Sequence, residues 1–140
     1  MKRTASAQWQ GGLKDGKGSV STQSKVLSQT QYSFGTRFEN GIGTNPEELI
    51  AAAHAACFSM ALSGQLGAAS LTAESIQTAA SLNFEKLDSG WTVTEIHLDV
   101  KCKIPGADKK AFETAANNAK AGCPISRLLN TKITMEANLI

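Results

Sequence analysis

The chain has too few cysteines, in too loose a pattern, for a disulfide scaffold or a structural zinc site. Cys57, Cys102 and Cys123 are the only three in 140 residues, and an odd number of thiols in a chain long enough to bury a core argues against a disulfide framework. The sequence contains no Cys-x-x-Cys pair and no His-x-x-x-His pair, which are common ligand spacings in zinc sites. We therefore expect no metal or other cofactor, and thiols that are either inert core residues or redox-active groups.

Clusters of basic residues and long apolar runs are also absent. The 14 Lys and Arg residues are scattered and the formal net charge is only +2, which argues against a surface for nucleic acid or an anionic membrane. Residues 1–9 are basic without the apolar run of a signal peptide, and residues 46–66 are too rich in Ala, Ser, Gln and Glu for a membrane span. We expect a cytoplasmic protein that contacts neither nucleic acid nor membrane.

The sequence does contain the pattern of a folded domain. Apolar residues make up 41% and charged residues 19% of the chain, a balance typical of globular proteins, and the length suits a single domain over residues 1–140. The predicted elements are, in chain order, a hairpin over 4–10 and 19–26, an irregular polar stretch over 27–40, a long helix over 46–66, strands over 73–84 and 91–104, helices over 107–121 and 124–129, and a closing strand over 131–139. This order predicts an α+β fold.

The helix over 46–66 is the stretch around which the chain is organised. Glu47 and Glu48 lie in its first turn and complement its dipole. The rest is almost uncharged and rich in Ala and Leu, which predicts burial on nearly every side. Gly67 is expected to end it in the left-handed conformation. The helix holds Cys57, and a lone cysteine in a buried helix is usually a small core residue.

The three thiols differ in their surroundings. Cys102 falls on the apolar face of the alternating strand over 91–104, which predicts a packing residue. Cys123 lies at a predicted helix start with Arg127 one turn further on, and both features favour a thiolate; a thiol that merely caps the helix is an equal alternative. Cys57 lies about eleven residues into its helix, beyond the reach of the dipole, so it is reactive only if a cation comes from elsewhere.

Two residues are candidates to activate Cys57. His54 lies one turn before it, and is either the base of a cysteine–histidine pair or a hydrogen-bonded packing residue. Arg37, flanked by Phe34 and Phe38, is either stacked for structure or held desolvated for use. Both residues keep both interpretations at this point.

The two acids of the first turn are not equivalent. At about 100° per residue, Glu47 lies roughly 80° around the helix from Cys57 and Glu48 roughly 180°. Yet roughly ten residues at about 1.5 Å each put Glu47 about 15 Å from Cys57 along the axis. If Glu47 and Cys57 serve one site, a second helix must bring them together, as the antiparallel helices of a two-fold dimer would. Otherwise both acids are ordinary first-turn residues.

Three motifs, taken together, resemble those of one protein family. They are Thr36-Arg37-Phe38; Gly43-Thr44-Asn45-Pro46-Glu47-Glu48-Leu49-Ile50 leading into Ala52-Ala53-His54-Ala55-Ala56-Cys57-Phe58-Ser59-Met60; and Ala121-Gly122-Cys123-Pro124. They are similar to the motifs of the OsmC/Ohr family of osmotically inducible and organic hydroperoxide resistance proteins. The arginine in the loop before the long helix resembles that of the osmotically inducible branch.

The resemblance implies a fold and a reaction. The fold is OsmC-like, an antiparallel sheet packed on a long central helix, in an intertwined homodimer with its sites at the subunit interface. The implied activity is a thiol peroxidase that reduces organic hydroperoxides through a Cys57 sulfenic acid and a Cys57–Cys123 disulfide, with an external thiol or dithiol as reductant. By position, Cys57 is the peroxidatic and Cys123 the resolving thiol. Arg37 would stabilise the Cys57 thiolate, and Glu47 would hold Arg37. Candidates for an apolar substrate wall are Phe34, Phe38, Phe58, Met60 and Leu62.

Two other classes of function stay open. A hydrolase or transferase would use Cys57 with His54, and would lose activity in His54→Ala but not in Cys123→Ser. A non-catalytic dimer that senses oxidants or binds a small apolar ligand would consume at most one equivalent of peroxide per site, even with excess thiol.

Overall fold

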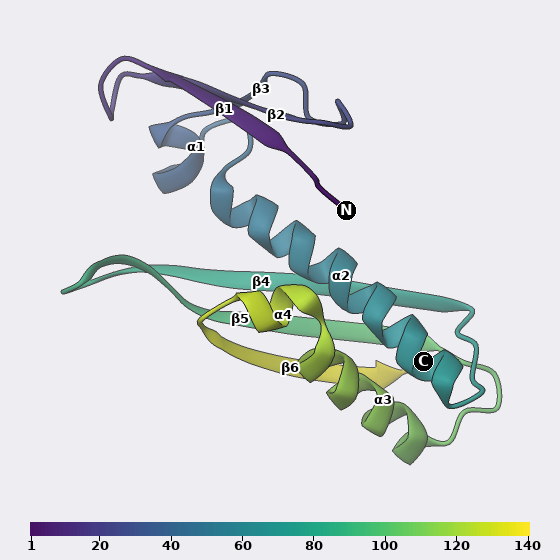
Figure 1. Cartoon of the computed structure of the whole chain (residues 1–140). Coiled ribbons are helices and arrows are strands. Elements are labelled where there is room, and N and C mark those ends of the chain that lie inside the picture. The colour runs from purple at the N-terminus through teal and green to yellow at the C-terminus, as the bar shows by residue number, and fades with distance from the viewer. The chain divides into compact units, whose positions relative to one another are not determined.

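The computed structural model describes all residues from 1 to 140. The chain divides into two compact units, Met1–Leu49 and Ile50–Ile140, and the division falls inside the long helix α2 (Pro46–Ala68) (Figure 1).

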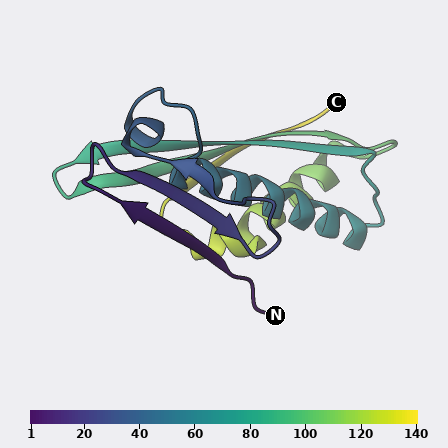
Figure 2. The ribbon, with the colours of Figure 1, turned by 90° about the horizontal axis from the view of Figure 1, so that it is seen from above.

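Unit 1 is built on a small antiparallel sheet. Its strands β1 (Ala5–Gln10), β2 (Lys17–Thr22) and β3 (Thr30–Tyr32) lie in the order β1-β2-β3, and Figure 2 shows β1 and β2 as adjacent arrows of opposite direction. The predicted hairpin is therefore confirmed. Gly18 has no space for a side chain, because an added Cβ would lie 2.5 Å from the Tyr32 ring.

The stretch predicted to be irregular holds two regular elements, so that prediction was wrong. These are β3 and the short helix α1 (Phe34–Phe38). A capping box begins α1: the Thr36 amide donates to Ser33 Oγ at 3.2 Å, and the Ser33 amide donates to Thr36 Oγ1 at 2.8 Å. Two amides at the helix start are satisfied in this way, which stabilises a helix of only five residues.

Helix α2 begins as predicted and ends later than predicted. The Asn45 side chain accepts a hydrogen bond from the Glu48 amide at 2.8 Å, and the Glu48 carboxylate accepts one from Thr44 Oγ1 at 2.9 Å. At the other end, the Leu71 amide donates to the Leu66 carbonyl at 2.9 Å, and the left-handed residue is Ser70, with φ of 58°. This is a Schellman end, displaced beyond the predicted glycine at 67.

Only one stripe of α2 is buried. It consists of His54, Phe58, Leu62 and Leu66, spaced one turn apart, whereas Met60 is 78% exposed. The prediction of burial on nearly every side is therefore wrong for the single chain, and an apolar face of α2 is left uncovered. By length and a mean hydropathy of 1.4 alone, α2 could also cross a membrane, contrary to the sequence-based expectation, but core helices pass the same test.

The sheet of unit 2 is mixed. Strands β4 (Ser75–Leu87) and β5 (Gly90–Lys103) form a long antiparallel hairpin, and β6 (Lys132–Leu139) pairs with β5 in parallel. The expected antiparallel sheet is thus correct for β4 and β5 and wrong for β6. A parallel neighbour needs a crossover, and helices α3 (Lys109–Gly122) and α4 (Pro124–Leu128) provide it.

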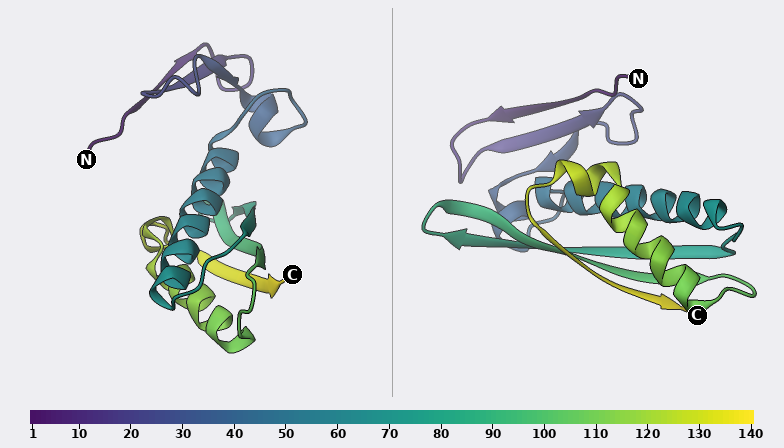
Figure 3. Two further views of the ribbon diagram at one scale, coloured as in Figure 1. Left: turned by 90° about the vertical axis from the view of Figure 1, so that its right-hand side faces the viewer. Right: turned by 60° about the horizontal axis from the view of Figure 1, so that its bottom comes forward.

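The core of unit 2 lies between one face of this sheet and its helices, which Figure 3 shows on the same side of the sheet. The alternating residues of β5 point into it, as predicted, and Cys102 among them is fully buried. The buried face of α3 covers them with Phe112, Ala115, Ala116 and Ala119. The packing role of Cys102 is therefore confirmed, and burial raises the pKa of its thiol.

Candidate active site

Two thiols far apart in sequence meet in unit 2. Cys57 comes from the middle of α2, and Cys123 is the single residue that joins α3 to α4. Their Sγ atoms are hydrogen bonded at 3.0 Å, across a sequence separation of 66. Cys57 is partly exposed and Cys123 is completely buried. A reagent from solvent therefore reaches Cys57 first, with Cys123 directly behind it.

The surroundings affect the two thiols in opposite directions. Burial, together with the hydrogen bond to Cys123, raises the pKa of Cys57. Burial also acts to raise the pKa of Cys123, but hydrogen bonding with Cys57, with the amide and hydroxyl of Ser126 and with the Ile125 amide outweighs it and lowers this pKa below its ordinary value. The Cys123 side chain makes no N-cap hydrogen bond, but the groups of Ile125 and Ser126 still act to lower the pKa of its thiol. The groups of unit 2 thus favour a thiolate on Cys123 and not on Cys57.

His54 is not paired with Cys57. Its Nε2 atom lies 2.7 Å from Ser126 Oγ, in a hydrogen bond between α2 and α4, and its Nδ1 atom is buried without a partner. Burial lowers the pKa of the imidazole, so the ring is neutral near pH 7. A cysteine–histidine hydrolase needs a hydrogen bond between base and nucleophile, and neither ring nitrogen provides it here.

The second predicted pair forms in unit 1. Arg37 Nη2 and Glu47 Oε1 lie 2.6 Å apart, and Arg37 Nε donates to both carboxylate oxygens at 3.1 Å. The guanidinium also lies over the Phe38 ring, 5.3 Å from its centroid. Glu48 instead accepts from Thr44, so the two neighbouring acids have separate partners. This fork of two donors against one carboxylate fixes the orientation of the guanidinium.

An aromatic cavity adjoins Arg37. It has a volume of about 280 Å³ and is lined by Trp9, Leu13, Tyr32, Ser33, Phe34, Arg37, Phe38 and Pro46. Of the five apolar residues considered as a substrate wall, Phe34 and Phe38 line this cavity. Phe58 and Leu62 belong to the core instead, and Met60 is exposed.

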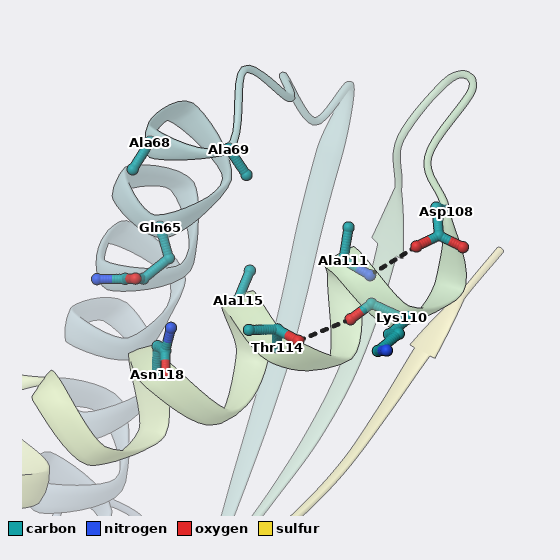
Figure 4. Close-up of a pocket in the computed structure, with 9 residues that line it drawn as sticks. All are labelled: Gln65, Ala68, Ala69, Asp108, Lys110, Ala111, Thr114, Ala115 and Asn118. Carbon is teal, nitrogen blue, oxygen red and sulfur yellow. Dashed lines mark hydrogen bonds between the residues drawn. The ribbon is translucent and has the colours of Figure 1, made fainter.

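A groove between α2 and α3 holds neither thiol. Figure 4 shows its lining, which includes Gln65, Asn118 and several alanines, around a volume of about 490 Å³. Its acid, Asp108, caps α3 by accepting from the Ala111 amide at 3.0 Å, and the Thr114 hydroxyl donates to the Lys110 carbonyl at 2.9 Å. Asp108 and Thr114 are thus engaged in holding α3.

Sequence reasoning missed Ser126. It is hydrogen bonded to His54 and acts to lower the pKa of Cys123, but a serine in a short helix three positions after a cysteine carries no distinctive pattern. The signal that could have pointed to it is its place at the third position of the helix that Cys123 begins, where backbone and side chain both turn toward the cap.

Comparison with known proteins identifies the class that this fold and these motifs define. The family model described as "OsmC-like protein" matches residues 38–138, and the chain belongs to the OsmC family. Over 139 residues, which are 99% of this chain and 97% of the relative, it is 50% identical to "Peroxiredoxin OsmC" of Escherichia coli strain K12. It is 28% identical over 100 residues, 71% of this chain and 68% of the relative, to "Organic hydroperoxide resistance protein" of Xanthomonas axonopodis pv. citri. The chain is a cysteine-based peroxidase.

Solved structures support the same fold. The "OsmC like protein" from Mycoplasma pneumoniae superposes with a TM-score of 0.79 at 15% identity, covering 100% of this chain and 98% of that one. The organic hydroperoxide resistance protein OhrB of Bacillus subtilis superposes with a TM-score of 0.69 at 22% identity, covering 98% of each chain. The fold is therefore OsmC-like.

Proposed function

We propose that the protein reduces organic hydroperoxides to alcohols with Cys57 as the peroxidatic and Cys123 as the resolving thiol. The observation that carries this proposal is the thiol pair itself, with sulfurs 3.0 Å apart, one partly exposed and the other buried behind it. An exposed thiolate can attack a peroxide, and a second thiol in contact can attack the oxidised sulfur without leaving its place.

The proposed cycle has three steps. The Cys57 thiolate attacks the terminal peroxide oxygen, the O–O bond breaks, and the alkoxide takes a proton and leaves as an alcohol. Cys57 is now a sulfenic acid. The Cys123 sulfur attacks Cys57 Sγ, an S–S bond forms, and the S–O bond breaks to release water. Two equivalents of an external thiol, or one dithiol, then reduce the disulfide.

Arg37 is proposed to supply the cation that Cys57 lacks in unit 2. Local groups raise the pKa of Cys57, so a thiolate there requires a positive charge from elsewhere. Glu47 holds the guanidinium by a fork of hydrogen bonds. Glu47 and Cys57 are about 15 Å apart along one helix, so we further propose a homodimer that covers the apolar face of α2 and completes each site. The proposed location is the cytoplasm.

The proposed substrate class follows from the surroundings of Arg37. The adjoining cavity is lined mostly by aromatic and aliphatic side chains, which suits the carbon chain of an organic hydroperoxide better than hydrogen peroxide. A relative at 28% identity is named for organic hydroperoxide resistance, in agreement with this choice.

The test is peroxide consumption with excess dithiol, using cumene hydroperoxide and hydrogen peroxide in parallel. Wild type should turn over many times and prefer the organic peroxide, and Cys57→Ser should have no activity. Cys123→Ser should consume one equivalent unless the added thiol resolves the sulfenic acid. Full turnover in Cys57→Ser would sink the assignment, and a single stoichiometric reaction in wild type would make the protein a sensor.

The Arg37–Glu47 pair can be tested with a matched control, because Glu48 lies next to Glu47 and has another partner. Glu47→Gln should lower kcat/KM for cumene hydroperoxide by about tenfold or more, because the hydrogen bonds to a charged group are weakened. Glu48→Gln should leave kcat/KM near the wild-type value, since Glu48 bonds Thr44 instead. Equal losses in both variants would remove the proposed role of the Arg37–Glu47 pair.

A further inference from the structure

A buried histidine and a buried serine lie next to the thiol pair and have no part in the proposed reaction. His54 is completely buried and Ser126 is 8% exposed. Their hydrogen bond, 2.7 Å from Nε2 to Oγ, joins α2 to α4 across 72 positions. Two polar side chains buried together from distant segments are costly unless they are well paired, so their partners indicate what they do.

Ser126 lies three residues after Cys123, at the third position of the helix that Cys123 begins, and its amide and hydroxyl act to lower the pKa of the Cys123 thiol. The His54–Ser126 hydrogen bond therefore ties α2 to α4 beside the Cys123–Cys57 contact, and we refer to His54 and Ser126 together as the relay. A hydroxyl has a single proton to donate. When it donates that proton to the Cys123 sulfur, it must accept its other hydrogen bond from His54.

The unpartnered Nδ1 atom of His54 indicates which tautomer is present. Nδ1 is buried and has no hydrogen-bond partner. Buried N–H groups without partners are rarer than buried acceptors without partners, so Nδ1 is the bare nitrogen and Nε2 carries the hydrogen of the neutral ring. Nε2–H then donates to Ser126 Oγ, which leaves the Ser126 hydrogen for another acceptor, and the Cys123 sulfur is the group whose pKa this hydroxyl lowers.

We propose that His54 and Ser126 are positioning residues that hold Cys123 ready as the nucleophile of the disulfide-forming step. The proposal rests on the proposed function, in which an organic hydroperoxide has oxidised Cys57 to the sulfenic acid. The electron pair of the Cys123 thiolate forms the S–S bond, the S–O bond of Cys57 breaks, and the oxygen leaves as hydroxide, which an acid of the buffer protonates to water. By stabilising the thiolate and fixing its direction, the relay speeds this step and leaves the oxidation of Cys57 unchanged.

The experiment separates the two steps in time. Reduced protein is mixed with one equivalent of cumene hydroperoxide, the Cys57 sulfenic acid is trapped with dimedone at successive times, and intact mass gives the sulfenic acid and disulfide populations. In Ser126→Ala the sulfenic acid should appear at the wild-type rate within about twofold. Its conversion to the disulfide should slow by about tenfold or more, since a hydrogen bond to a charged group is lost.

Conservative variants distinguish a positioning role from a structural one. Ser126→Thr keeps the hydroxyl and should restore rapid disulfide formation. His54→Gln keeps an N–H donor and should also be fast, whereas His54→Leu should be as slow as Ser126→Ala and tests the relay from the other helix. Ser59→Ala is the matched control, because that hydroxyl bonds the Ala55 carbonyl and Thr78 Oγ1 outside the relay, and it should leave both steps unchanged.

Three outcomes would contradict the proposed role of His54 and Ser126. If Ser126→Ala and His54→Leu form the sulfenic acid normally and convert it to the disulfide at the wild-type rate, the positioning role of the relay is overturned. The proposed function would then still stand. If Ser126→Thr forms the disulfide as slowly as Ser126→Ala does, the positioning role is also overturned. If wild type forms no Cys57 sulfenic acid, the proposed function fails, and the role of the relay fails with it.

Discussion

Closing a disulfide between Cys57 and Cys123 should stabilise the fold by about 4 kcal/mol. The two residues are 66 positions apart, and a cross-link over such a loop removes about 15 cal/mol/K of chain entropy from the unfolded state, or about 4 kcal/mol at 25 °C. The folded state needs little adjustment to close the bond. Its sulfurs already lie 3.0 Å apart, and a disulfide requires about 2.05 Å.

The assay is urea denaturation of two samples at the same protein concentration. One is kept reduced with excess dithiol, and the other is oxidised with one equivalent of cumene hydroperoxide and then freed of reagent. The free energy of unfolding, extrapolated to water, should be about 4 kcal/mol larger for the oxidised sample. Cys57→Ser should unfold identically under both treatments, because it cannot form the bond. A gain below about 1 kcal/mol in wild type would refute the reasoning, since it would mean that the folded chain must distort to bring the sulfurs together.

Three further predictions concern stability. Ser70→Gly removes a left-handed non-glycine residue from the end of α2 and should raise the free energy of unfolding in urea by about 1 kcal/mol; a decrease would show that the site is not strained. Phe58→Ala opens a cavity at a fully buried position and should cost about 3–5 kcal/mol by the same measurement, and a cost below about 1 kcal/mol would contradict its place in the core. Hydrogen bonds from Lys132 and Thr134 lower the pKa of Glu95, so its carboxylate contributes stability that is present above the ordinary carboxyl pKa and is lost as pH falls through the lowered value. The difference in urea midpoint between wild type and Glu95→Gln should therefore be present at neutral pH and vanish in acid, and a difference independent of pH would contradict this assignment.

The sequence predicted correctly those elements that depend only on residues close together in the chain. The alternation of Ile96, Leu98, Val100 and Cys102 predicted both the strand and its buried face, because strand side chains alternate between faces whatever the rest of the fold does. The Cys123–Pro124 pair predicted a helix start for a similarly local reason, since proline at the first position loses no hydrogen bond.

Some local signals were present and were overlooked. Ser33 and Thr36 have the spacing of a capping box, which begins α1, but the polar composition around them favoured a loop. The end of α2 was misplaced because glycine is the usual left-handed residue, whereas here Ser70 takes that conformation. Propensity ranks residues but does not decide where packing ends a helix.

The candidate site depends on contacts that no local pattern encodes. Neither the approach of Cys57 to Cys123 nor that of His54 to Ser126 follows from periodicity, because these contacts join segments 66 and 72 positions apart. The resemblance to a known family suggested the first of these contacts and was silent on the second. The parallel placement of β6 likewise depends on the crossover through α3 and α4, which period and composition do not specify.

The position of Cys123 at the joint between two helices makes its backbone an anchor. Its amide donates to the Ala119 carbonyl of α3 at 2.8 Å, and its carbonyl accepts from the Arg127 amide of α4 at 3.0 Å. The sulfur can therefore swing about its own Cα–Cβ bond while the chain on both sides stays still. A cycle of oxidation and reduction that moves one sulfur by about 1 Å therefore leaves the backbone of α3 and α4 in place. Oxidation then causes no change of backbone conformation that a partner protein could recognise, which suits a peroxidase better than a redox sensor.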